Sequence, residues 1–368
     1  MNNDSKAYWL WLYLVLGPFN ARFIELLDEF DDIEGIYASR EHPAFLARLS
    51  KHENSVLKTV GIEDAKALAE RCKKQRIEVV WYKSRYYPVR LTRTKMPPMI
   101  LFVTGSPEML EPVFAVSGVG ARFSTEYGRA AVKHICEPLA RAGITLISGM
   151  AYGIDAEVHK AALLAKGRTI AVLGTAIDMT YPAAHKELRE KIEQNGAVIS
   201  EYAPGTETYK PMFSQRNRII SGLSQAVIVF EAAKKSGTMI TASWAADDGR
   251  EVFAVPGSIL SPHSEGTNLL IKNGAALCGS AADILEALDI DPEICESSEI
   301  ALDIRQVDMS DIQRRLYDAF DGKDMTVDEL AFKTGMEPHA VLAELTELEM
   351  EGVISAKGGS RYARKAYV

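Results

Sequence analysis

Three glycine-containing turns hold the residues of this chain that are best suited to bind a phosphate. They are Ser117–Ser124 (SGVGARFS), Ser148–Asp155 (SGMAYGID) and Ser236–Thr241 (SGTMIT). Glycine lets the backbone approach an anion closely, and a helix that begins at such a turn offers free N–H groups and the positive end of its dipole. The candidate anion-binding residues are Gly118, Gly120, Ser148, Gly149, Ser236, Gly237 and Thr238. Ordinary N-capping by Ser236 or Thr238 is the alternative for the third turn. Three such turns together favour phosphate binding.

Arg122 lies in the first of these turns and adds a planar guanidinium, which can bind a phosphate with two hydrogen bonds or stack on a base. The turn does not match the GxGxxG dinucleotide fingerprint, because Phe123 and Ser124 occupy its far end. An acidic residue that could bind a ribose about 20 residues further on is also missing. A dinucleotide site is therefore disfavoured.

Asp155 and His159 are four residues apart in the helical stretch that follows the second turn, so they share one helix face. The pair could be a general base and the carboxylate that orients it. A structural hydrogen bond between the two side chains is the other interpretation, and it is the more common one. We therefore expect no catalytic residue here.

A short segment that starts at Lys210 combines cations with an aromatic ring. Lys210, Arg216 and Arg218 supply positive charge, Asn217 an amide and Phe213 a ring, all within nine residues. Grooves for single-stranded nucleic acid need this combination, since cations track the phosphates and each base stacked on a ring contributes about 1–3 kcal/mol. The alternative is that Phe213 belongs to the core and the arginines are solvated or paired internally.

The elements that must position these residues alternate between strands and helices from about residue 99 to 288. Short, β-branched, nearly continuous apolar runs predict strands at Val113–Ser117, Thr145–Ser148, Thr169–Leu173, Ala197–Glu201, Ala226–Phe230, Glu251–Val255 and Ala275–Leu277. Helical stretches such as Thr125–Arg141 and Ile154–Lys166 fill the gaps. This alternation predicts an α/β fold, a Rossmann-like, doubly wound and mostly parallel sheet. Open sheets of this kind bind ligands at the carboxyl ends of their strands, where the three turns lie.

Different patterns flank this central region. Residues 1–80 have the spacing of short helices, and 57–65 resemble the turn of a helix–hairpin–helix, for which a simple helical packing domain is the alternative. Residues 289–308 are acidic and lack periodicity, whereas three helices and a hairpin after them form a winged-helix pattern. We predict four segments: a helical N-terminal domain of helix-hairpin-helix or SAM-like type (1–85), a Rossmann-like domain (86–288), a linker (289–308) and a winged helix (309–368).

The distribution of charge matters more than its total. The 368 residues carry a formal net charge of −8, which would normally argue against a nucleic-acid partner. Residues 1–98 carry +3, residues 99–288 carry −2 and residues 289–368 carry −9. The acidity belongs almost wholly to the last eighty residues, so it leaves a nucleic-acid groove in the central region possible.

Features of export and membrane insertion are absent from the sequence. The most apolar stretch, Ala7–Phe19, is shorter than the roughly 20 residues of a membrane span, and it lacks the basic start of a signal peptide. It is typical of a buried helix. The four cysteines are too scattered for a CxxC pair, which favours reduced thiols. We expect a cytoplasmic protein without a metal, a cofactor or a membrane partner.

Several segments, in this order along the chain, resemble the DNA processing protein A (DprA/Smf) family. They are VGARFSTEYG at Val119–Gly128, SGMAYGID at Ser148–Asp155, FSQRNRIISGLS at Phe213–Ser224, SGTMITA at Ser236–Ala242 and GREVFAVPGS at Gly249–Ser258. The resemblance runs from about Tyr87 to Ile284, and jointly these motifs are specific. Accessory helical and winged-helix domains also occur in that family.

The resemblance implies a non-enzymatic, homodimeric protein that binds single-stranded DNA. Such a protein protects incoming DNA and loads the RecA recombinase during natural transformation (competence) and recombination. The family's groove uses an arginine, a lysine and a phenylalanine that match Arg122, Lys210 and Phe213. The chain departs from the family pattern at three positions: Tyr152 for a usual arginine, Ser214 for a usual proline and His185 for a common asparagine.

Two other function classes compete with this one. Related Rossmann-like N-glycosidases of the lysine-decarboxylase-like group process nucleotides, but Thr241 stands where their catalytic carboxylate would be, and only Glu201 or Glu231 could replace it. A transcription regulator would read DNA with the winged helix. Its presumed recognition helix, Glu337–Met350, carries four glutamates and no lysine or arginine, so it would repel DNA. A protein partner therefore suits the winged helix better.

Overall fold

The computed structural model describes residues 3–290, 310–320, 325–350, 354–357 and 361–364. The chain divides into two compact units, Met1–Asp291 and Pro292–Val368. The linker predicted at 289–308 lies, from residue 291 on, outside the described residues. The predicted boundary between the helical N-terminal domain (1–85) and the Rossmann-like domain (86–288) stays a prediction.

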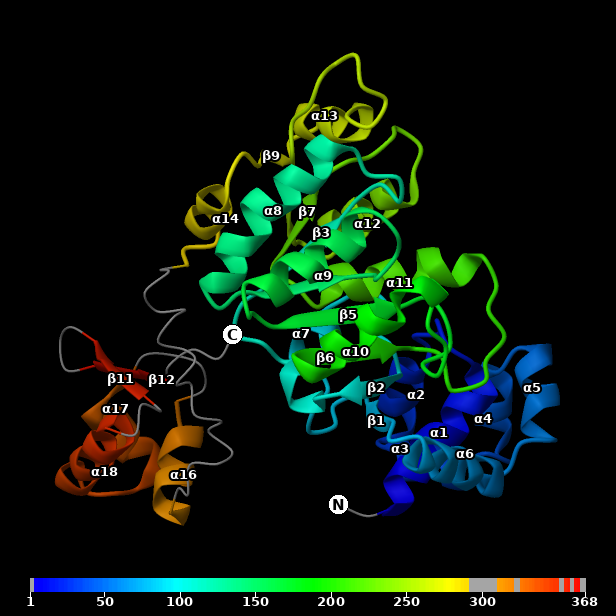
Figure 1. The fold of residues 1–368 in the computed structure, drawn as a ribbon. Coiled ribbons are helices and arrows are strands. Elements are labelled where there is room, and N and C mark those ends of the chain that lie inside the picture. The colour runs from blue at the N-terminus through cyan, green and yellow to red at the C-terminus, as the bar shows by residue number, and fades with distance from the viewer. Residues whose placement is uncertain (1–2, 291–309, 321–324, 351–353, 358–360, 365–368) are drawn as a thin grey trace. The chain divides into compact units, whose positions relative to one another are not determined.

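A nine-stranded sheet forms the centre of the first unit, in the order β1-β2-β6-β5-β4-β3-β7-β8-β9 (Figure 1). Its strands are β1 (Glu78–Trp81), β2 (Ile100–Gly105), β3 (Ala115–Val119), β4 (Thr145–Ser148), β5 (Thr169–Leu173), β6 (Gly196–Ser200), β7 (Ala226–Val229), β8 (Glu251–Ala254) and β9 (Ala276–Leu277). The seven strands from β3 to β9 are parallel, and their central members are buried along their whole length. The predicted Rossmann-like fold is confirmed.

Two strands, β1 and β2, were not predicted from the sequence. β2 pairs antiparallel with β6, and β1 pairs antiparallel with β2 at the edge of the sheet. The prediction of helices throughout residues 1–80 is therefore wrong at Glu78–Val80, which begin β1. The apolar runs were present, but antiparallel edge strands lack the strand–helix alternation on which the prediction relied.

Helices cover the sheet in two layers. α8 (Glu126–Arg141), α9 (Ile154–Leu164) and α10 (Lys186–Gln194) pack side by side, whereas α11 (Pro211–Gly222) packs with α12 (Gly237–Asp247). Right-handed crossovers explain this separation, since the chain moves outward from β3 to β6 and then returns to β7 on the other side of β3. The short helices α7 (Val89–Thr92), α13 (Glu265–Lys272) and α14 (Ala281–Ala287) complete the covering.

The N-terminal helices continue the same hydrophobic core. They are α1 (Asn3–Leu16), α2 (Phe23–Phe30), α3 (Ile33–Ala38), α4 (Pro43–Arg48), α5 (Lys51–Leu57) and α6 (Ile62–Lys74). α1 contacts β1 and β2, and its residues from Trp9 to Tyr13 are all buried. The apolar stretch Ala7–Phe19 is thus mainly a core helix, as predicted, and no helix among the described residues is long and apolar enough to cross a membrane.

In its described residues, the second unit has three helices and a small sheet around a core of its own. Its elements are α16 (Asp311–Asp318), α17 (Val327–Thr334), α18 (Pro338–Met350), β10 (Met325–Thr326), β11 (Ile354–Lys357) and β12 (Arg361–Arg364). β12 pairs with both β10 and β11. This is the predicted winged-helix order; the proposed turn at Gly358-Gly359 lies outside the described residues.

Candidate nucleic-acid interface

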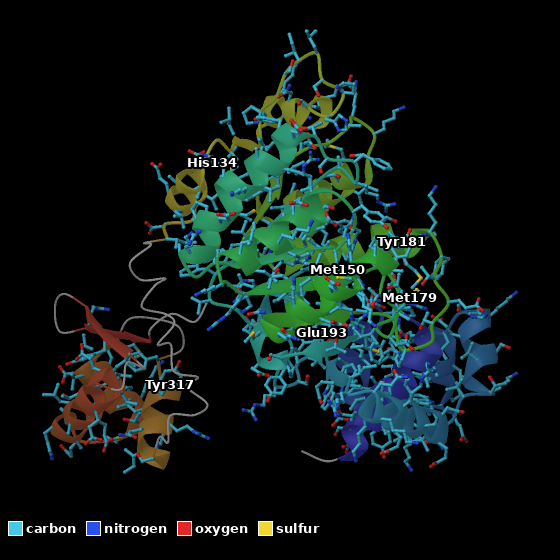
Figure 2. All side chains as sticks on the ribbon, viewed as in Figure 1. His134, Met150, Met179, Tyr181, Glu193 and Tyr317 are labelled. Atoms are coloured by element: carbon cyan, nitrogen blue, oxygen red, sulfur yellow. The ribbon has the colours of Figure 1, made fainter. Side chains whose placement is uncertain are left out.

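The carboxyl ends of the parallel strands gather the three glycine-containing turns at one edge of the sheet. The first turn follows β3, the second follows β4 and the third follows β7, which is hydrogen-bonded to β3 on its other side. The strand order reverses between β3 and β7, which is where open sheets of this type bind ligands. Met150 and Tyr181, which Figure 2 labels, belong to the loops that follow β4 and β5.

Arg122 and Phe213 meet at this edge, although they are far apart in the sequence. The guanidinium carbon of Arg122 lies 5.7 Å from the centroid of the Phe213 ring, a cation–π arrangement. Tyr181 extends the aromatic surface, with its ring centroid 5.2 Å from that of Phe213. Gly174 explains the close fit, because a β-carbon there would come within 2.9 Å of the Phe213 ring. Arg122 is exposed and Phe213 is half-buried, so both remain accessible from solvent.

Lys210 and Asn217 lie on the same helical segment as Phe213. Lys210 is exposed and immediately precedes α11, while Asn217 is half-buried and donates to the Gly237 carbonyl at 3.2 Å. That bond connects α11 to the third turn. Lys210 can therefore add positive charge beside the aromatic surface, whereas Asn217 helps to position the third turn.

Arg216 does not face solvent, which corrects its prediction as a neutraliser of DNA charge. It is only 5% exposed, and its Nη1 donates to the carbonyl oxygens of Gly149, at 2.8 Å, and Val172. Burial lowers the pKa of Arg216 to about 10, and the nearby carboxylate of Asp155 opposes that shift. Its guanidinium thus holds together the ends of β4 and β5, and a phosphate cannot reach it.

Arg218 is also an internal residue, and the same correction applies. Its Nη2 lies 2.6 Å from Oε1 of Glu201, and both side chains are 2% exposed. The guanidinium carbon of Arg218 lies 5.0 Å from the ring centroid of Phe19, in the loop after α1, and Glu201 accepts a hydrogen bond from the Phe19 amide at 3.1 Å. Arg218 therefore connects α11 to the N-terminal helices.

Asp155 and His159 do not form the predicted pair. Nδ1 of His159 lies 2.7 Å from the Thr169 hydroxyl, and its Nε2 is buried without a hydrogen-bond partner in the part of the chain that the structure describes. Burial lowers the pKa of His159 to about 3, and the charge of Arg216 contributes in the same direction. Burial raises the pKa of Asp155, while Arg216 partly offsets this effect. The two residues share a helix face, but packing directs them to different neighbours.

The first turn uses its glycines mainly for packing. A β-carbon on Gly118 would come within 2.6 Å of Val158, and one on Gly120 within 2.6 Å of Ile154. The start of α8 already has an anionic partner, because Glu231, just after β7, accepts hydrogen bonds from the Thr125 amide, at 3.0 Å, and from the Thr125 hydroxyl. The α8 N-terminus is therefore occupied by a carboxylate of the chain itself.

The second and third turns differ in accessibility. Ser148 is buried, and its hydroxyl donates to the Gly118 carbonyl at 2.7 Å; Gly149 is buried as well. These two predicted contacts are thus internal. Gly237 is exposed with open space around its α-carbon, whereas Thr238 is buried and the Ser236 hydroxyl is buried without a hydrogen-bond partner among the described residues. In the third turn, it is therefore the backbone at Gly237 that could bind an anion at the N-terminus of α12.

Comparison with known proteins decides the family. A family model described as DNA recombination-mediator protein A matches residues 78–289, more than half of the chain. The chain belongs to this family. A second model, the DprA winged helix domain, matches residues 305–360. The predicted resemblance is confirmed, and the family's domain contains the whole strand-end edge described above.

Relatives and solved structures agree with this assignment. The chain is 40% identical to Protein Smf of Escherichia coli over 282 residues, 75% of this chain and 74% of that protein. It is also 40% identical to DNA processing protein DprA of Bacillus subtilis over 216 residues, 59% of this chain and 73% of that protein. The crystal structure of DprA from Streptococcus pneumoniae superposes with a TM-score of 0.67 at 32% identity, covering 76% of this chain and 97% of that one.

A second solved structure of the family concerns nucleic acid directly. It describes the single-stranded DNA binding mode of DNA processing protein A from Helicobacter pylori. It superposes with a TM-score of 0.53 at 28% identity, covering 58% of this chain and 98% of that one.

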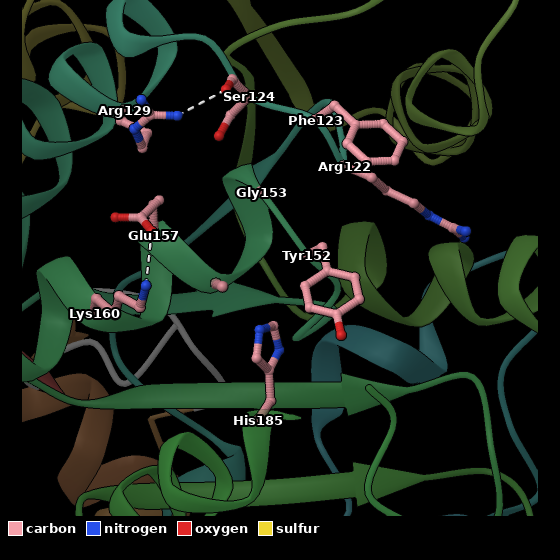
Figure 3. A pocket seen from close by; sticks show the side chains of 10 residues that line it. Arg122, Phe123, Ser124, Arg129, Tyr152, Gly153, Glu157, Lys160 and His185 are labelled. Atoms are coloured by element: carbon pink, nitrogen blue, oxygen red, sulfur yellow. Dashed lines mark hydrogen bonds and ion pairs between the residues drawn. The ribbon is translucent and has the colours of Figure 1, made fainter. Parts of the chain in front are cut away.

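The sequence did not lead us to predict one part of the surface at the carboxyl ends of the strands. Phe123 and Tyr152 are 87% and 51% exposed, and with Lys160 and Arg129 they line a hollow of about 480 Å³ (Figure 3). We call it the side hollow, and its full lining is Arg122, Phe123, Ser124, Arg129, Tyr152, Gly153, Ala156, Glu157, Lys160 and His185. The available signal was an aromatic residue inside a glycine-containing turn that follows a strand, and it was not used for Phe123.

Proposed function

We propose that this chain binds single-stranded DNA at the carboxyl edge of its sheet. The observation that carries the proposal is the stacking of the Arg122 guanidinium over the Phe213 ring at 5.7 Å, on an exposed edge. One side chain can neutralise a phosphate and the other can stack a base, which are the two requirements of sequence-tolerant single-strand binding. The Helicobacter pylori relative, whose structure concerns single-stranded DNA binding, supports the proposal.

Within this groove, we assign different roles to the residues predicted from the sequence. Arg122 and Lys210 neutralise phosphates, Phe213 stacks a base, and the exposed backbone of Gly237 at the start of α12 offers an N–H group to a further phosphate. Arg216, Ser148 and Gly149 support the groove from below. Because these contacts are to phosphates and base faces, we expect little preference for base sequence.

The wider role is proposed from the family. We propose that the chain acts as a homodimer in the cytoplasm, protects incoming single strands and loads RecA recombinase during natural transformation and recombination. The winged helix takes a protein partner in this proposal, because the exposed part of α18 carries glutamates and would repel DNA. Light scattering gives the oligomeric state, and RecA filament formation on single-stranded DNA, with and without the chain, tests loading.

We propose that the chain is not an enzyme. The two carboxylates that could have replaced the missing acid of an N-glycosidase are engaged elsewhere, since Glu201 pairs with Arg218 and Glu231 caps α8. Thr241 is buried in α12. Incubation with nucleoside monophosphates tests this directly, because release of free base would contradict the non-enzymatic role.

Fluorescence anisotropy with labelled single- and double-stranded oligonucleotides over a salt series tests the DNA proposal. We expect tighter binding to the single strand and a linear decrease of log affinity with log salt concentration. Equal affinity for both forms, or no salt dependence, would rule out the proposed groove.

A further inference from the structure

The side hollow combines two kinds of wall next to the proposed groove. The rings of Phe123 and Tyr152 lie on one side, and the basic side chains of Arg129 and Lys160 lie on the other (Figure 3). Its volume of about 480 Å³ lies within the range of small-molecule sites, roughly 300–1,000 Å³. Neither the predicted site nor the proposed function uses Phe123, Arg129 or Lys160.

The aromatic wall is exposed and partly fixed in place. Phe123 is 87% exposed, so its ring contributes little to the core. The Tyr152 ring makes an edge-to-face contact with His185, with centroids 5.0 Å apart, and Nδ1 of His185 lies 2.9 Å from the Met150 carbonyl oxygen. This chain of contacts holds Tyr152 at the hollow. A ring held at a surface in this way can stack a base with little loss of side-chain entropy.

Charges in the hollow favour a base over a phosphate as its occupant. Lys160 pairs with Glu157 at 2.8 Å, and Arg129 donates to the Ser124 carbonyl at 2.7 Å. The Glu157 carboxylate therefore opposes an anion on that wall. A neutral base stacked on the rings is not repelled by this carboxylate, and its phosphates can lie beside Arg122 rather than on the wall that carries Glu157.

The groove and the side hollow are continuous. Arg122 lines the hollow and also lies over Phe213. The loop after β5 contributes to both places, because Tyr181 contacts the Phe213 ring and His185 contacts the Tyr152 ring. A strand held at Phe213 would pass Arg122 and reach the hollow without leaving this surface.

We infer that the side hollow is a second base-binding subsite for the same DNA strand, in which an unpaired base stacks on Tyr152 or Phe123. Arg122 holds the backbone between this base and the one at Phe213. The inference rests on the proposed single-stranded DNA binding. It assigns a role to Tyr152 that depends on the ring rather than on charge.

Oligothymidylates of increasing length, titrated by fluorescence anisotropy at one salt concentration, test this subsite. The shortest oligonucleotide with measurable affinity should occupy only the subsite at Phe213. The variants Phe123→Ala and Tyr152→Ala should bind it as tightly as the unmodified chain does. They should bind lengths that span both subsites about tenfold more weakly. Tyr152→Phe, which keeps the ring, should retain affinity at every length. Phe332→Ala is the matched control, because Phe332 is an equally exposed phenylalanine of the winged-helix unit.

The possible outcomes separate the two proposals. Unchanged affinity of Phe123→Ala and Tyr152→Ala at all lengths overturns the second subsite and leaves the proposed function intact. An equal loss at every length also overturns it, because the residues would then belong to the first subsite. Failure of the unmodified chain to bind any oligothymidylate rejects the proposed function and this inference together.

Discussion

The guanidinium of Arg216 lies directly against Gly149 and donates to its carbonyl oxygen at 2.8 Å. Only glycine fits at this position, because a β-carbon would overlap the guanidinium. The same guanidinium binds the Val172 carbonyl, so one buried cation joins the carboxyl ends of β4 and β5. This edge of the sheet thus rests on a buried arginine, while the arginine that is exposed to solvent, Arg122, comes from the turn after β3.

Arg122→Ala should weaken single-strand binding about tenfold for every base sequence. It should also lower the slope of log affinity against log salt by about one, because one phosphate contact is lost. Fluorescence anisotropy over a salt series gives both quantities. Arg168→Ala is the matched control, since Arg168 is exposed and precedes β5, at the opposite edge of the sheet. Equal behaviour of the two variants would place the groove elsewhere.

Gly149→Ala should lower stability by roughly 2–3 kcal/mol, because the added methyl displaces the buried Arg216 guanidinium and breaks its hydrogen bonds. DNA affinity should fall because the edge that carries the proposed groove is deformed. The slope of log affinity against log salt concentration should stay unchanged, since we propose that Arg216 contacts no phosphate. Urea denaturation and the salt series measure the two effects. For stability, Gly237→Ala is the comparison, because a β-carbon there meets open space. A reduced salt slope in Gly149→Ala would assign a direct phosphate contact to Arg216.

Glu201→Gln should destabilise the first unit by about 3–5 kcal/mol, because it leaves the Arg218 charge buried without its counterion. Adding Arg218→Met should recover much of that loss, since the uncompensated charge is then removed. Urea denaturation of the single and double variants gives the coupling. The pair Arg189–Glu193 is more exposed, so Glu193→Gln should cost less. If the double variant were as unstable as the single one, the ion pair would not explain the loss.

Stability should fall below pH 6.5 because of His159. Its pKa is lowered to about 3 in the folded state by burial, and an unfolded histidine titrates near 6.5, so the unfolded state binds the proton first. The contribution of the neutral His159 to the free energy of unfolding is fully present above pH 6.5 and is lost progressively as the pH falls towards 3. At pH 5.5 the loss amounts to about 1.4 kcal/mol. The raised pKa of Asp155 acts in the opposite sense at lower pH, near the range of carboxylates.

Chemical denaturation at pH 7.5 and pH 5.5 measures this effect. His159→Gln removes the titrating group and should flatten the dependence, while keeping a polar side chain near Thr169. The exposed His134, on α8, is the control, and His134→Gln should leave the dependence as it was. A pH dependence that survives His159→Gln would have to come from other groups.

The sequence by itself determined the parallel core, its carboxyl-edge turns and the winged-helix order. Buried parallel strands are nearly continuous apolar runs, and alternation with helices leaves few topologies for them. The antiparallel strands β1 and β2 lacked that alternation and were missed. The motifs around Arg122 and Phe213 also sufficed to predict their family and their part in one surface.

Only the tertiary structure decided which charges face solvent. Lys210, Arg216 and Arg218 lie within nine residues, yet the first is exposed and the other two are buried with Asp155 and Glu201 nearby. A helix turns about 100° per residue, so the side that meets the core depends on packing against distant strands and on partners from other segments. Burial of a cation is tolerated only where those partners compensate its charge, and no local sequence pattern specifies them.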